Sequence, residues 1–340
     1  MKGEAVIKGL LSDIRKQYTI IACICTNGTQ DDSKQAQELE AEAKIKSLDP
    51  EHINIHYVNL DDLHSCVRAL TGAEGAFVVT YFYSTLPHDS EREDQAERYA
   101  RVVVDACAAS GSVKHLVLST MEQADDVVNE LKDSDVGSKP LSDVKARIAS
   151  YARAKHISMT YLIMPVYSEQ FFQALAEKIR NHEGMADEGN TIPNEHEDDI
   201  AVSENKDEKG VCMSAEMLGP AVANIFDSYE VYAGHEIGLM TDVLSFGEAT
   251  EIINQVFFGS ISSRPQDTCA DISKSHSDYR FDIVAKDLGQ MFRCYSKTDA
   301  VKHRDSIAKT LELVPDAKPF KRWLEENRDN AEFREMLGLR

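Results

Sequence analysis

The first apolar residues of the chain recur with the spacing of an amphipathic helix. One face of this predicted helix collects Val6, Ile7, Leu10, Leu11 and Ile14. The run TIIACIC at residues 19–25 comes next, and its short length and β-branched side chains predict a buried strand. The chain therefore opens with a helix that leads into a strand.

Strands and helices continue to alternate as far as Pro165. Further strands are expected at residues 52–58, 75–82, 115–119 and 159–165. Helices are expected at residues 33–48, 63–70, 93–109 and 141–155, with Asp61 or Asp62 as the cap of the second. This alternation predicts a parallel sheet covered by helices on both faces. We interpret residues 1–165 as one α/β domain and residues 166–340 as a smaller C-terminal region.

The pattern changes after Pro165. Residues 183–210 are acidic and almost free of aromatic residues, which predicts a mobile loop because little apolar surface is available to offset the entropy of ordering. Beyond this loop we expect a strand at residues 234–240. Helices are expected at residues 215–229, 246–258, 279–296 and 320–337.

Charge and composition exclude several classes of partner. The formal net charge of -21 disfavours nucleic acid and anionic membrane surfaces, because both attract clustered Lys and Arg. The longest apolar runs, such as YLIMPVY, are far shorter than the ~20 residues that span a bilayer. The seven cysteines form no C-x-x-C pair, which predicts reduced thiols in the cytoplasm, with the nucleus as a second location. Cys23 with Cys25, and His52 with His56, have no further ligand at suitable spacing, so we expect no metal site.

Several strings along the chain resemble the NmrA-like family of atypical short-chain dehydrogenases, whose best-known members are NADP(H)-responsive regulators. These strings, in the order and spacing of the family, are AFVVTYFYS, VKHLVLSTME, LSDVKARIASY, MPVYSEQFF, MSAEMLGPAVANIF, VYAGHEIGL, KDLGQMFRCYS and WLEENRD. The C-terminal strings are most similar to the redox-sensor branch. The resemblance extends from about Lys2 to about Asp329. It implies a Rossmann-like doubly wound parallel sheet, which binds NAD(P) in residues 1–165, and a smaller α/β C-terminal region.

The same resemblance places Gly3 as the last glycine of a G-x-x-G-x-x-G loop that holds the cofactor pyrophosphate. The first two glycines and the strand before them would then precede Met1. Two explanations remain: the coding start was placed too late, or the protein lost its cofactor loop. We favour the first, because the missing strand would be central in the doubly wound order and its loss would leave two strand edges unpaired.

The resemblance also implies other cofactor-binding residues. Three of them, Thr26, Thr80 and Tyr167, have a purely structural role as the alternative. Thr26 stands where the family has an Arg for the NADP 2′-phosphate, or it is a turn residue. Asn59 stands at the adenine contact. Thr80 lies beside the nicotinamide ribose, or it satisfies local backbone groups. Pro165 and Tyr167 match the turn that lines the nicotinamide end of the cleft, or Tyr167 is a core aromatic residue.

Catalysis in short-chain dehydrogenases needs a Tyr and a Lys four residues apart, with a Ser that orients the substrate carbonyl. Tyr151 and Lys155 have this spacing, and Ser119 ends a strand. The register of the family instead places the Lys at Lys145, a ribose contact or a solvated helix residue, and the Tyr at Leu141, which has no proton to donate. Tyr151 would then pack within the helix, and Lys155 would occupy its last turn.

Two functions follow from the resemblance. The first is a non-enzymatic regulatory protein that senses NADP(H), or has a degenerate NAD(P) site, and acts through protein partners, which include a second copy of the chain. The alternative is an NAD(P)-dependent oxidoreductase that acts on a small carbonyl or quinone substrate. The substitution at Leu141 favours the first.

Overall fold

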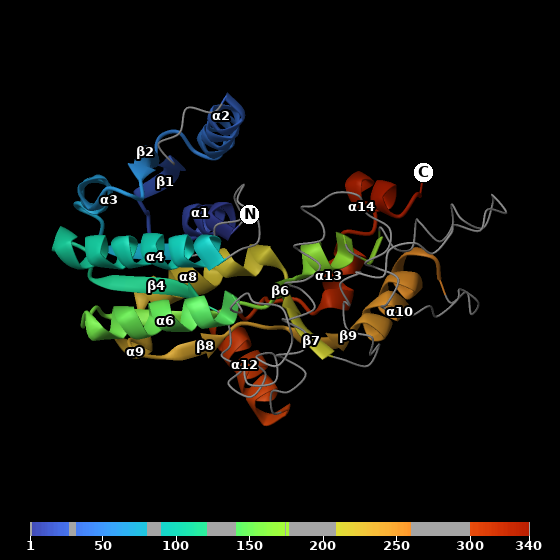
Figure 1. The fold of residues 1–340 in the computed structure, drawn as a ribbon. Helices are drawn as coiled ribbons and strands as arrows, with labels where there is room; N and C mark the ends of the chain where they lie inside the picture. Colours follow the sequence, from blue (N-terminus) through green and yellow to red (C-terminus); the bar gives the residue numbers. More distant parts are fainter. Residues whose placement is uncertain are drawn as a thin grey trace. The chain divides into compact units, whose positions relative to one another are not determined.

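The computed structural model describes residues 2–26, 32–79, 90–120, 141–173, 175–176, 209–259 and 300–339 (Figure 1). The chain forms two compact units. Unit 1 comprises Met1–Met164, Ala215–Gly238 and Glu312–Val314. Unit 2 comprises Pro165–Ser214, Leu239–Leu311 and Pro315–Arg340.

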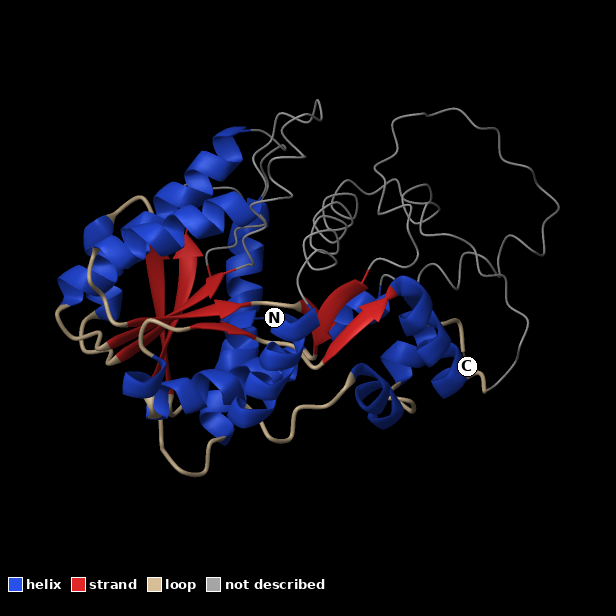
Figure 2. Ribbon diagram, turned by 90° about the horizontal axis from the view of Figure 1, so that it is seen from below, coloured by secondary structure: helices blue, strands red, loops and turns tan. Residues whose placement is uncertain are grey.

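Unit 1 is built of parallel strands and the helices that connect them. Its strands are β1 (Ile20–Thr26), β2 (Ile53–Asn59), β3 (Gly75–Val79), β4 (His115–Thr120), β5 (Met159–Ile163) and β8 (Glu236–Gly238). Its longer helices are α1 (Lys2–Ser12), α2 (Asp32–Lys46), α3 (Leu63–Leu70), α4 (Ser90–Ser110), α6 (Leu141–Ala154) and α8 (Leu218–Asp227). Two short helices of the described part also belong to it, η1 (Ala215–Met217) and α9 (Tyr229–Tyr232). Figure 2 shows helices on both sides of the strands.

The strands of unit 1 form two separate hydrogen-bonded groups. β1 pairs with β2, and β3, β4, β5 and β8 follow one another in a second sheet. Every one of these pairings is parallel. Among the described strands, β1 and β3 therefore each keep one edge without a strand partner.

The core of unit 1 lies on both faces of β4 and β5. Leu116, Val117 and Leu118 of β4 are at most 1% exposed. Leu116 and Leu118 pack with buried residues of α4 and α6, including Val104 and Ile148. α8 lies against β4, and α1 packs along α8. The continuous apolar strands predicted from the sequence are thus the buried centre of this sheet.

α1 and α8 approach so closely that each needs a glycine at the crossing. A Cβ atom on Gly9 would lie 2.3 Å from the Cα of Gly219, and one on Gly219 would lie 2.3 Å from the carbonyl oxygen of Ala5. The predicted first helix is confirmed, but it ends at Ser12. The prediction that Ile14 belongs to its apolar face is wrong, since Ile14 follows the helix and is 99% exposed.

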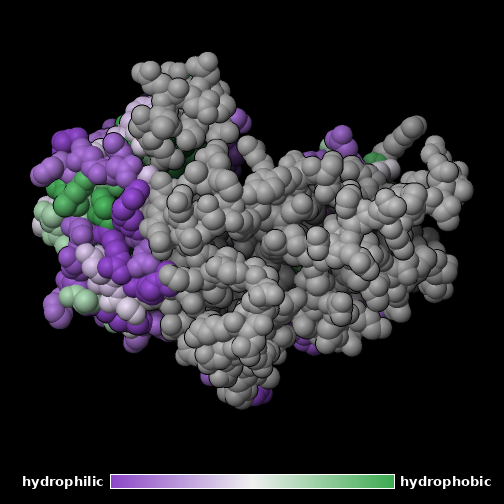
Figure 3. Space-filling model, viewed as in Figure 1, coloured by the Kyte–Doolittle hydropathy of each residue, from purple (hydrophilic) through white to green (hydrophobic). Residues whose placement is uncertain are grey.

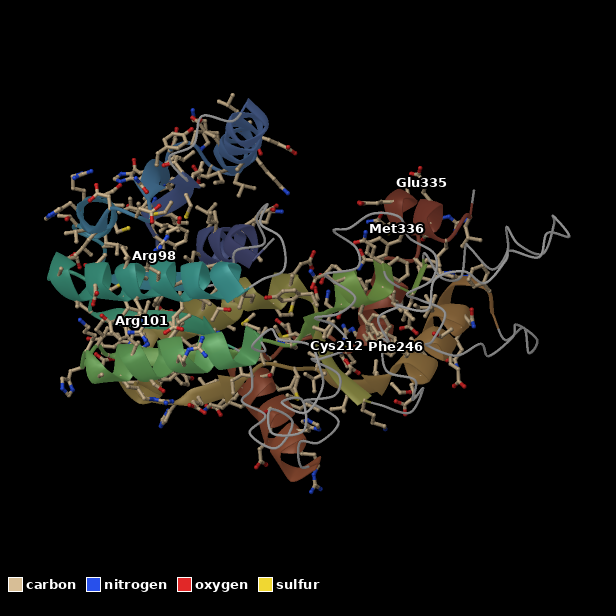
Figure 4. All side chains as sticks on the ribbon, in the orientation of Figure 1. Arg98, Arg101, Cys212, Phe246, Glu335 and Met336 are labelled. Atoms are coloured by element: carbon tan, nitrogen blue, oxygen red, sulfur yellow. The ribbon has the colours of Figure 1, made fainter. Side chains whose placement is uncertain are left out.

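Unit 2 has a small mixed sheet and an aromatic core. β6 (Val166–Tyr167) pairs with β7 (Lys209–Met213), and β7 pairs antiparallel with β9 (Asp242–Ser245). Its helices are α10 (Phe246–Phe257), most of α12 (Ala300–Leu313), α13 (Phe320–Glu326) and α14 (Ala331–Met336). The buried cluster contains Phe171, Phe172, Phe246, Phe320 and Trp323. Figure 4 labels Phe246 and Cys212 in this unit, and Met336 on α14.

Several C-terminal elements differ from the prediction. The single helix expected at residues 320–337 is two helices, because Asn330 caps α14 by accepting from the backbone N–H of Glu332. Residues 209–210, expected in the acidic loop, begin β7. The strand expected at residues 234–240 is only Glu236–Gly238. Residues 183–208 and the helix expected at residues 279–296 lie outside the described residues.

No helix within the described part of the chain has both the length and the apolar character needed to cross a membrane.

Candidate functional site

The candidate site of unit 1 is the edge at which its parallel strands end. Open α/β sheets bind ligands outside the carboxyl ends of their strands. Thr26 ends β1 and Asn59 ends β2, and these two residues are register partners. Ser119 lies one residue before the end of β4. Thr80 follows β3 directly but lies outside the described residues.

Thr26 bonds to the neighbouring strand, and Asn59 bonds to the turn that follows its own strand. The Thr26 hydroxyl donates to the carbonyl oxygen of Val58 at 3.4 Å. The Asn59 side-chain oxygen accepts from the backbone N–H of Asp61 at 2.9 Å, which closes the turn after β2. Asp62 then caps α3 by accepting from the N–H of His64. Thr26 thus joins the ends of β1 and β2, and Asn59 shapes the turn after β2. A contact of either residue with adenosine stays a prediction.

Among the described residues of this edge, Ser119 has the strongest physical reason to meet a ligand. Its side chain is fully buried, and its hydroxyl has no hydrogen-bond partner among the described residues. Its register partners are Val79 of β3 and Leu162 of β5, both apolar. A buried hydroxyl without a partner costs about 1–3 kcal/mol, and a polar group of a bound ligand would offset that cost.

The amino end of α1 offers backbone N–H groups but also a negative charge. Gly3 lies in the first turn and is exposed, with no atom within 4 Å of the position of a Cβ. Glu4 follows it and pairs with Lys8 at 2.8 Å and with Lys44 of α2 at 2.9 Å. Burial would raise the pKa of Glu4, but the two lysines outweigh burial and hold that pKa below its usual value. An ionised Glu4 repels a phosphate that approaches this helix end.

Tyr151 and Lys155 both bind Asp105 of the neighbouring helix α4. The Tyr151 hydroxyl donates to the carboxylate of Asp105 on α4, at 2.9 Å from each oxygen. The Lys155 ammonium lies 2.7 Å from the same carboxylate and 5.0 Å from the centre of the Tyr151 ring. The hydrogen bond to Asp105 raises the pKa of Lys155. The pair thus fastens α6 to α4.

The direction of α6 places this pair away from the candidate site. α6 begins at Leu141, after the carboxyl end of β4, and it leads back to the start of β5 at Met159. Tyr151 is ten residues beyond Leu141, about 15 Å along the axis at 1.5 Å per residue. Leu141 and Lys145 therefore lie at the end of α6 that is nearer the carboxyl edge. Their side chains lie outside the described residues.

Side chains spaced four residues apart on α4 contact side chains spaced four residues apart on α6. The sequence analysis did not predict these contacts. Glu97, Arg101 and Asp105 face Arg147, Tyr151 and Lys155. Arg147 lies 2.6 Å from Glu97, and the Arg101 guanidinium lies 4.5 Å from the centre of the Tyr151 ring. Figure 4 shows Arg101 between the two helices, and Figure 3 shows a mostly hydrophilic face there. The matching i, i+4, i+8 spacing on two helices was the available signal.

Pro165 and Tyr167 belong to unit 2. Tyr167 lies in β6, opposite Met213 of β7, and is 2% exposed. Burial, and then the charge of Glu169, raise its pKa well above the usual value for a phenol. This phenol therefore stays protonated at neutral pH.

The described residues fit part of a dinucleotide. Thr26 and Asn59 can face adenosine at the ends of adjacent strands, and Ser119 offers a buried hydroxyl that needs a partner. The phosphate end fits less well, because Glu4 occupies the first turn of α1 and Thr26 carries no positive charge for a 2′-phosphate. No group of three His, Cys, Asp or Glu side chains suited to a metal ion occurs within the part that the structure describes.

Solved structures with the same fold include reductases and a regulator. Triphenylmethane reductase from Citrobacter sp., complexed with NADP(H), has 16% sequence identity and a TM-score of 0.62, with 96% of this chain and 95% of that chain covered. NmrA, a negative transcriptional regulator in complex with NAD, has 13% identity and a TM-score of 0.56, with 96% and 99% covered. An NADPH-dependent quinone oxidoreductase from Escherichia coli has 18% identity and a TM-score of 0.60, with 96% of each chain covered.

These similarities confirm the Rossmann-like α/β fold predicted from the sequence. At the level of sequence, the NmrA-like family matches residues 5–324, which is nearly the whole chain. The chain therefore belongs to the NmrA-like family.

Proposed function

We propose that this protein is a non-catalytic member of its family that binds NADP(H) weakly and acts as a redox-responsive regulator through protein partners. The main support is that Asp105 binds both residues of the candidate catalytic pair: it accepts a hydrogen bond from Tyr151 and forms an ion pair with Lys155. A dehydrogenase of this type needs a Tyr that donates a proton to the substrate oxygen. The only Tyr of α6 instead donates a hydrogen bond to a carboxylate on the neighbouring helix.

Distance supports the same conclusion. Substrate and nicotinamide meet at the carboxyl edge in folds of this kind. Tyr151 is about 15 Å along α6 from the residue that begins the helix at that edge. Leu141, which holds the position of the catalytic Tyr in the family register, has no proton to donate. Hydride transfer to a carbonyl would therefore lack a proton donor on α6.

The comparison with NmrA supports a regulatory role. NmrA is described as a negative transcriptional regulator and was crystallised with NAD and with NADP. A dinucleotide-binding fold can thus serve regulation in this family. The chain has a net charge of -21, which disfavours binding to nucleic acid. We therefore propose that its partners are proteins.

Reduction of a small carbonyl or quinone is the second candidate function. Ser119, buried and without a hydrogen-bond partner among the described residues, favours it, since such a hydroxyl can hold a substrate carbonyl. The triphenylmethane reductase and the quinone oxidoreductase also support it.

Two measurements on the purified chain separate these functions. NADPH affinity is measured by calorimetry, and oxidation of NADPH is followed with small aldehydes, ketones and quinones. We expect weak binding and no turnover, with no change in Tyr151→Phe or Ser119→Ala. Turnover that disappears in Tyr151→Phe would overturn the proposal, and turnover that disappears only in Ser119→Ala would establish the second function.

The regulatory part of the proposal is tested by sedimentation. The oligomeric state of the chain is measured with and without saturating NADPH, alone and with a purified partner. A dinucleotide-dependent change in association supports the proposal. Association that is identical in both conditions contradicts a redox-responsive regulator.

A further inference from the structure

Five cysteines lie in the described part of the chain, and four of them come together in unit 1. Cys23 and Cys25 belong to β1, Cys66 to α3 and Cys107 to α4. These elements share one layer of the fold, since α3 contacts β1, β2 and α4 (Figure 1). The fifth, Cys212, is buried in unit 2. The candidate dinucleotide site uses none of these thiols.

The register of β1 and β2 turns the two thiols of β1 toward α3. Cys23 and Cys25 lie two residues apart, so their side chains share one face of the strand. Cys25 is the register partner of Val58 on β2, so these two side chains also share a face. Val58 packs in the same buried cluster as Cys66 of α3. The face of β1 that carries both thiols is therefore the face next to Cys66.

Cys66 lies near each of the other three thiols. Burial, and then the charge of Cys66, raise the pKa of Cys23 to about 11. Burial is also the main reason why the pKa of Cys25 and that of Cys107 are raised to about 12, and the charge of Cys66 contributes to both. Because salt screens charges beyond about 10 Å, these effects require that the thiols lie close together.

The thiols differ in their access to solvent. Cys23 and Cys25 are exposed, although the surrounding protein encloses them on other sides, whereas Cys66 is only 2% exposed. The Sγ of Cys66 donates a weak hydrogen bond to the carbonyl oxygen of Asn59 at 3.6 Å. A small solute can therefore reach the thiols of β1 but not Cys66. Cys66 reacts only if a thiol of β1 reacts first.

We propose that Cys66 forms a reversible disulfide with an exposed thiol of β1, which makes this cluster a site of oxidative modification. The oxidant is a small-molecule disulfide. The thiolate of Cys23 or Cys25 attacks one of its sulfur atoms, forms a mixed disulfide and releases one thiolate. The thiolate of Cys66 then attacks the protein sulfur of the mixed disulfide and releases the second. Two protein thiols are oxidised, one small disulfide is reduced, and the two protons pass to the released thiolates.

This disulfide would act on the end of β2. Cys66 lies in the first turn of α3, where the hydroxyl of Ser65 accepts from the backbone N–H of Asn59 at 3.2 Å. Oxidation removes the S–H that Cys66 donates to the carbonyl oxygen of Asn59. One of the hydrogen bonds that join the end of β2 to α3 is thus replaced by a covalent link from α3 to β1. Oxidation reaches this edge of the sheet without a dinucleotide.

Oxidised glutathione tests the proposal on the purified full chain. We expect peptide mapping to find a peptide with Cys66 joined to the peptide of β1, and dithiothreitol to separate them. The rate should rise about tenfold from pH 7 to pH 8, because the thiolate is the attacking group and the thiols of β1 are mostly protonated in this range. A rate that is the same at both pH values would exclude these thiols as the attacking groups.

Three variants assign the roles of the thiols. Cys66→Ala should stop the reaction at a mixed disulfide with glutathione on β1. The double variant Cys23→Ser and Cys25→Ser should leave Cys66 unmodified, because no exposed thiol delivers the oxidant to it. Cys107→Ala is the matched control, since Cys107 is a buried thiol of the same cluster on the other helix, and this variant should keep the link to Cys66. Mapping of the unaltered chain gives the pairing even where a variant does not fold.

Three results would overturn the proposal. The first is a mixed disulfide that persists in the unaltered chain without a link to Cys66. The second is a disulfide from β1 to Cys107, to a second copy of the chain, or to Cys269 or Cys294, which lie outside the described residues. The third is a link that Cys107→Ala abolishes as completely as Cys66→Ala does. Every measurement is made without a dinucleotide, so the result is independent of the proposed function.

Discussion

The phenol of Tyr151 donates a hydrogen bond to the carboxylate of Asp105, 46 residues earlier in the chain, at 2.9 Å. Lys155 lies 2.7 Å from the same carboxylate. Tyr151 and Lys155 have the sequence spacing of a catalytic Tyr-x-x-x-Lys pair. In the fold they instead form part of the contact between α4 and α6. The spacing places both side chains on one face of α6, and the partner on that face decides what they do.

Removing the carboxylate should therefore destabilise unit 1. We expect Asp105→Ala to lower the free energy of unfolding by about 1–3 kcal/mol, because the Tyr151 hydroxyl and the Lys155 ammonium lose their shared acceptor. Urea unfolding of Asp105→Ala, Tyr151→Phe and the double variant measures the coupling between the two residues. Strictly additive effects of the two single variants would contradict a direct interaction.

The crossing of α1 and α8 gives a second prediction with a control in the same helix. Gly9→Ala should destabilise the protein by about 1–3 kcal/mol, since its Cβ would overlap the backbone of Gly219. Gly3→Ala should be neutral or stabilising by up to about 1 kcal/mol, because no atom lies within 4 Å of its Cβ and alanine favours the helix. Thermal unfolding compares the two. Equal midpoints for both variants would show that α1 does not make this close approach.

A buried histidine gives a prediction about pH. His115 is 1% exposed, and its ring nitrogens lie 2.9 Å from the hydroxyls of Ser158 and Thr160. The Thr160 hydroxyl donates to the carbonyl oxygen of Tyr232, so it accepts from the Nε2–H of His115. Ser158 then donates to Nδ1, which satisfies the neutral ring. Burial lowers the pKa of His115 from 6.5 to about 4, against a small opposing effect of Glu230.

The sign of the pH effect follows from proton binding. Between about pH 6.5 and pH 4 the unfolded chain binds a proton at His115 and the folded chain does not. Stability is therefore full above this window and falls as the pH decreases through it, by on the order of 2 kcal/mol. Unfolding free energies are measured across the window for the wild-type chain and for His115→Gln. The variant should have a smaller slope, and an unchanged slope would assign the effect to other groups.

The sequence predicted the sheet of unit 1 better than the contacts between its helices. β4 and β5 are short apolar runs that are buried on both faces, so their composition alone identifies them. The turn after β2 was also readable, because Asp62 precedes an apolar helix and caps it. Asp105, in contrast, meets Tyr151 through the packing of two helices, and the four-residue spacing within each helix does not by itself say which two helices face each other.

The short elements of unit 2 escaped prediction for a related reason. β6 has 2 residues and β9 has 4, too few for a period to show. The break between α13 and α14 depends on Asn330, whose side chain accepts from the N–H groups of the next helix. Apolar residues on both sides of Asn330 have helical spacing, so the sequence predicted one continuous helix and not a cap at Asn330. Ile14 illustrates the opposite error, since its spacing continues that of α1 after the helix has ended.

Glu4 provides a test of the phosphate end of the proposed NADPH site. Glu4→Gln should raise NADPH affinity about three- to tenfold, because it removes a carboxylate from the first turn of α1 and releases Lys44 to face an anion. The gain should shrink as salt is added. Glu74→Gln is the matched control, since Glu74 is also paired with a lysine but precedes β3 at the opposite edge of the sheet. Calorimetric titration that shows equal gains in both variants would indicate a general charge effect.

Thr26 provides a test of cofactor preference. It ends β1, is partly exposed, and supplies one hydroxyl but no positive charge. Thr26→Arg should therefore raise NADPH affinity by about tenfold, since a bidentate contact between arginine and a phosphate contributes about 1.5–3 kcal/mol when partly exposed. NADH affinity should stay within about twofold, because NADH has no 2′-phosphate for the new guanidinium to bind.

Thr26→Gln is the control, because its side chain has a similar reach without the charge, and it should change neither the NADPH nor the NADH affinity. If Thr26→Arg raises the affinity for both dinucleotides equally, the end of β1 does not face the adenosine ribose, and the cofactor would have to lie elsewhere along the carboxyl edge.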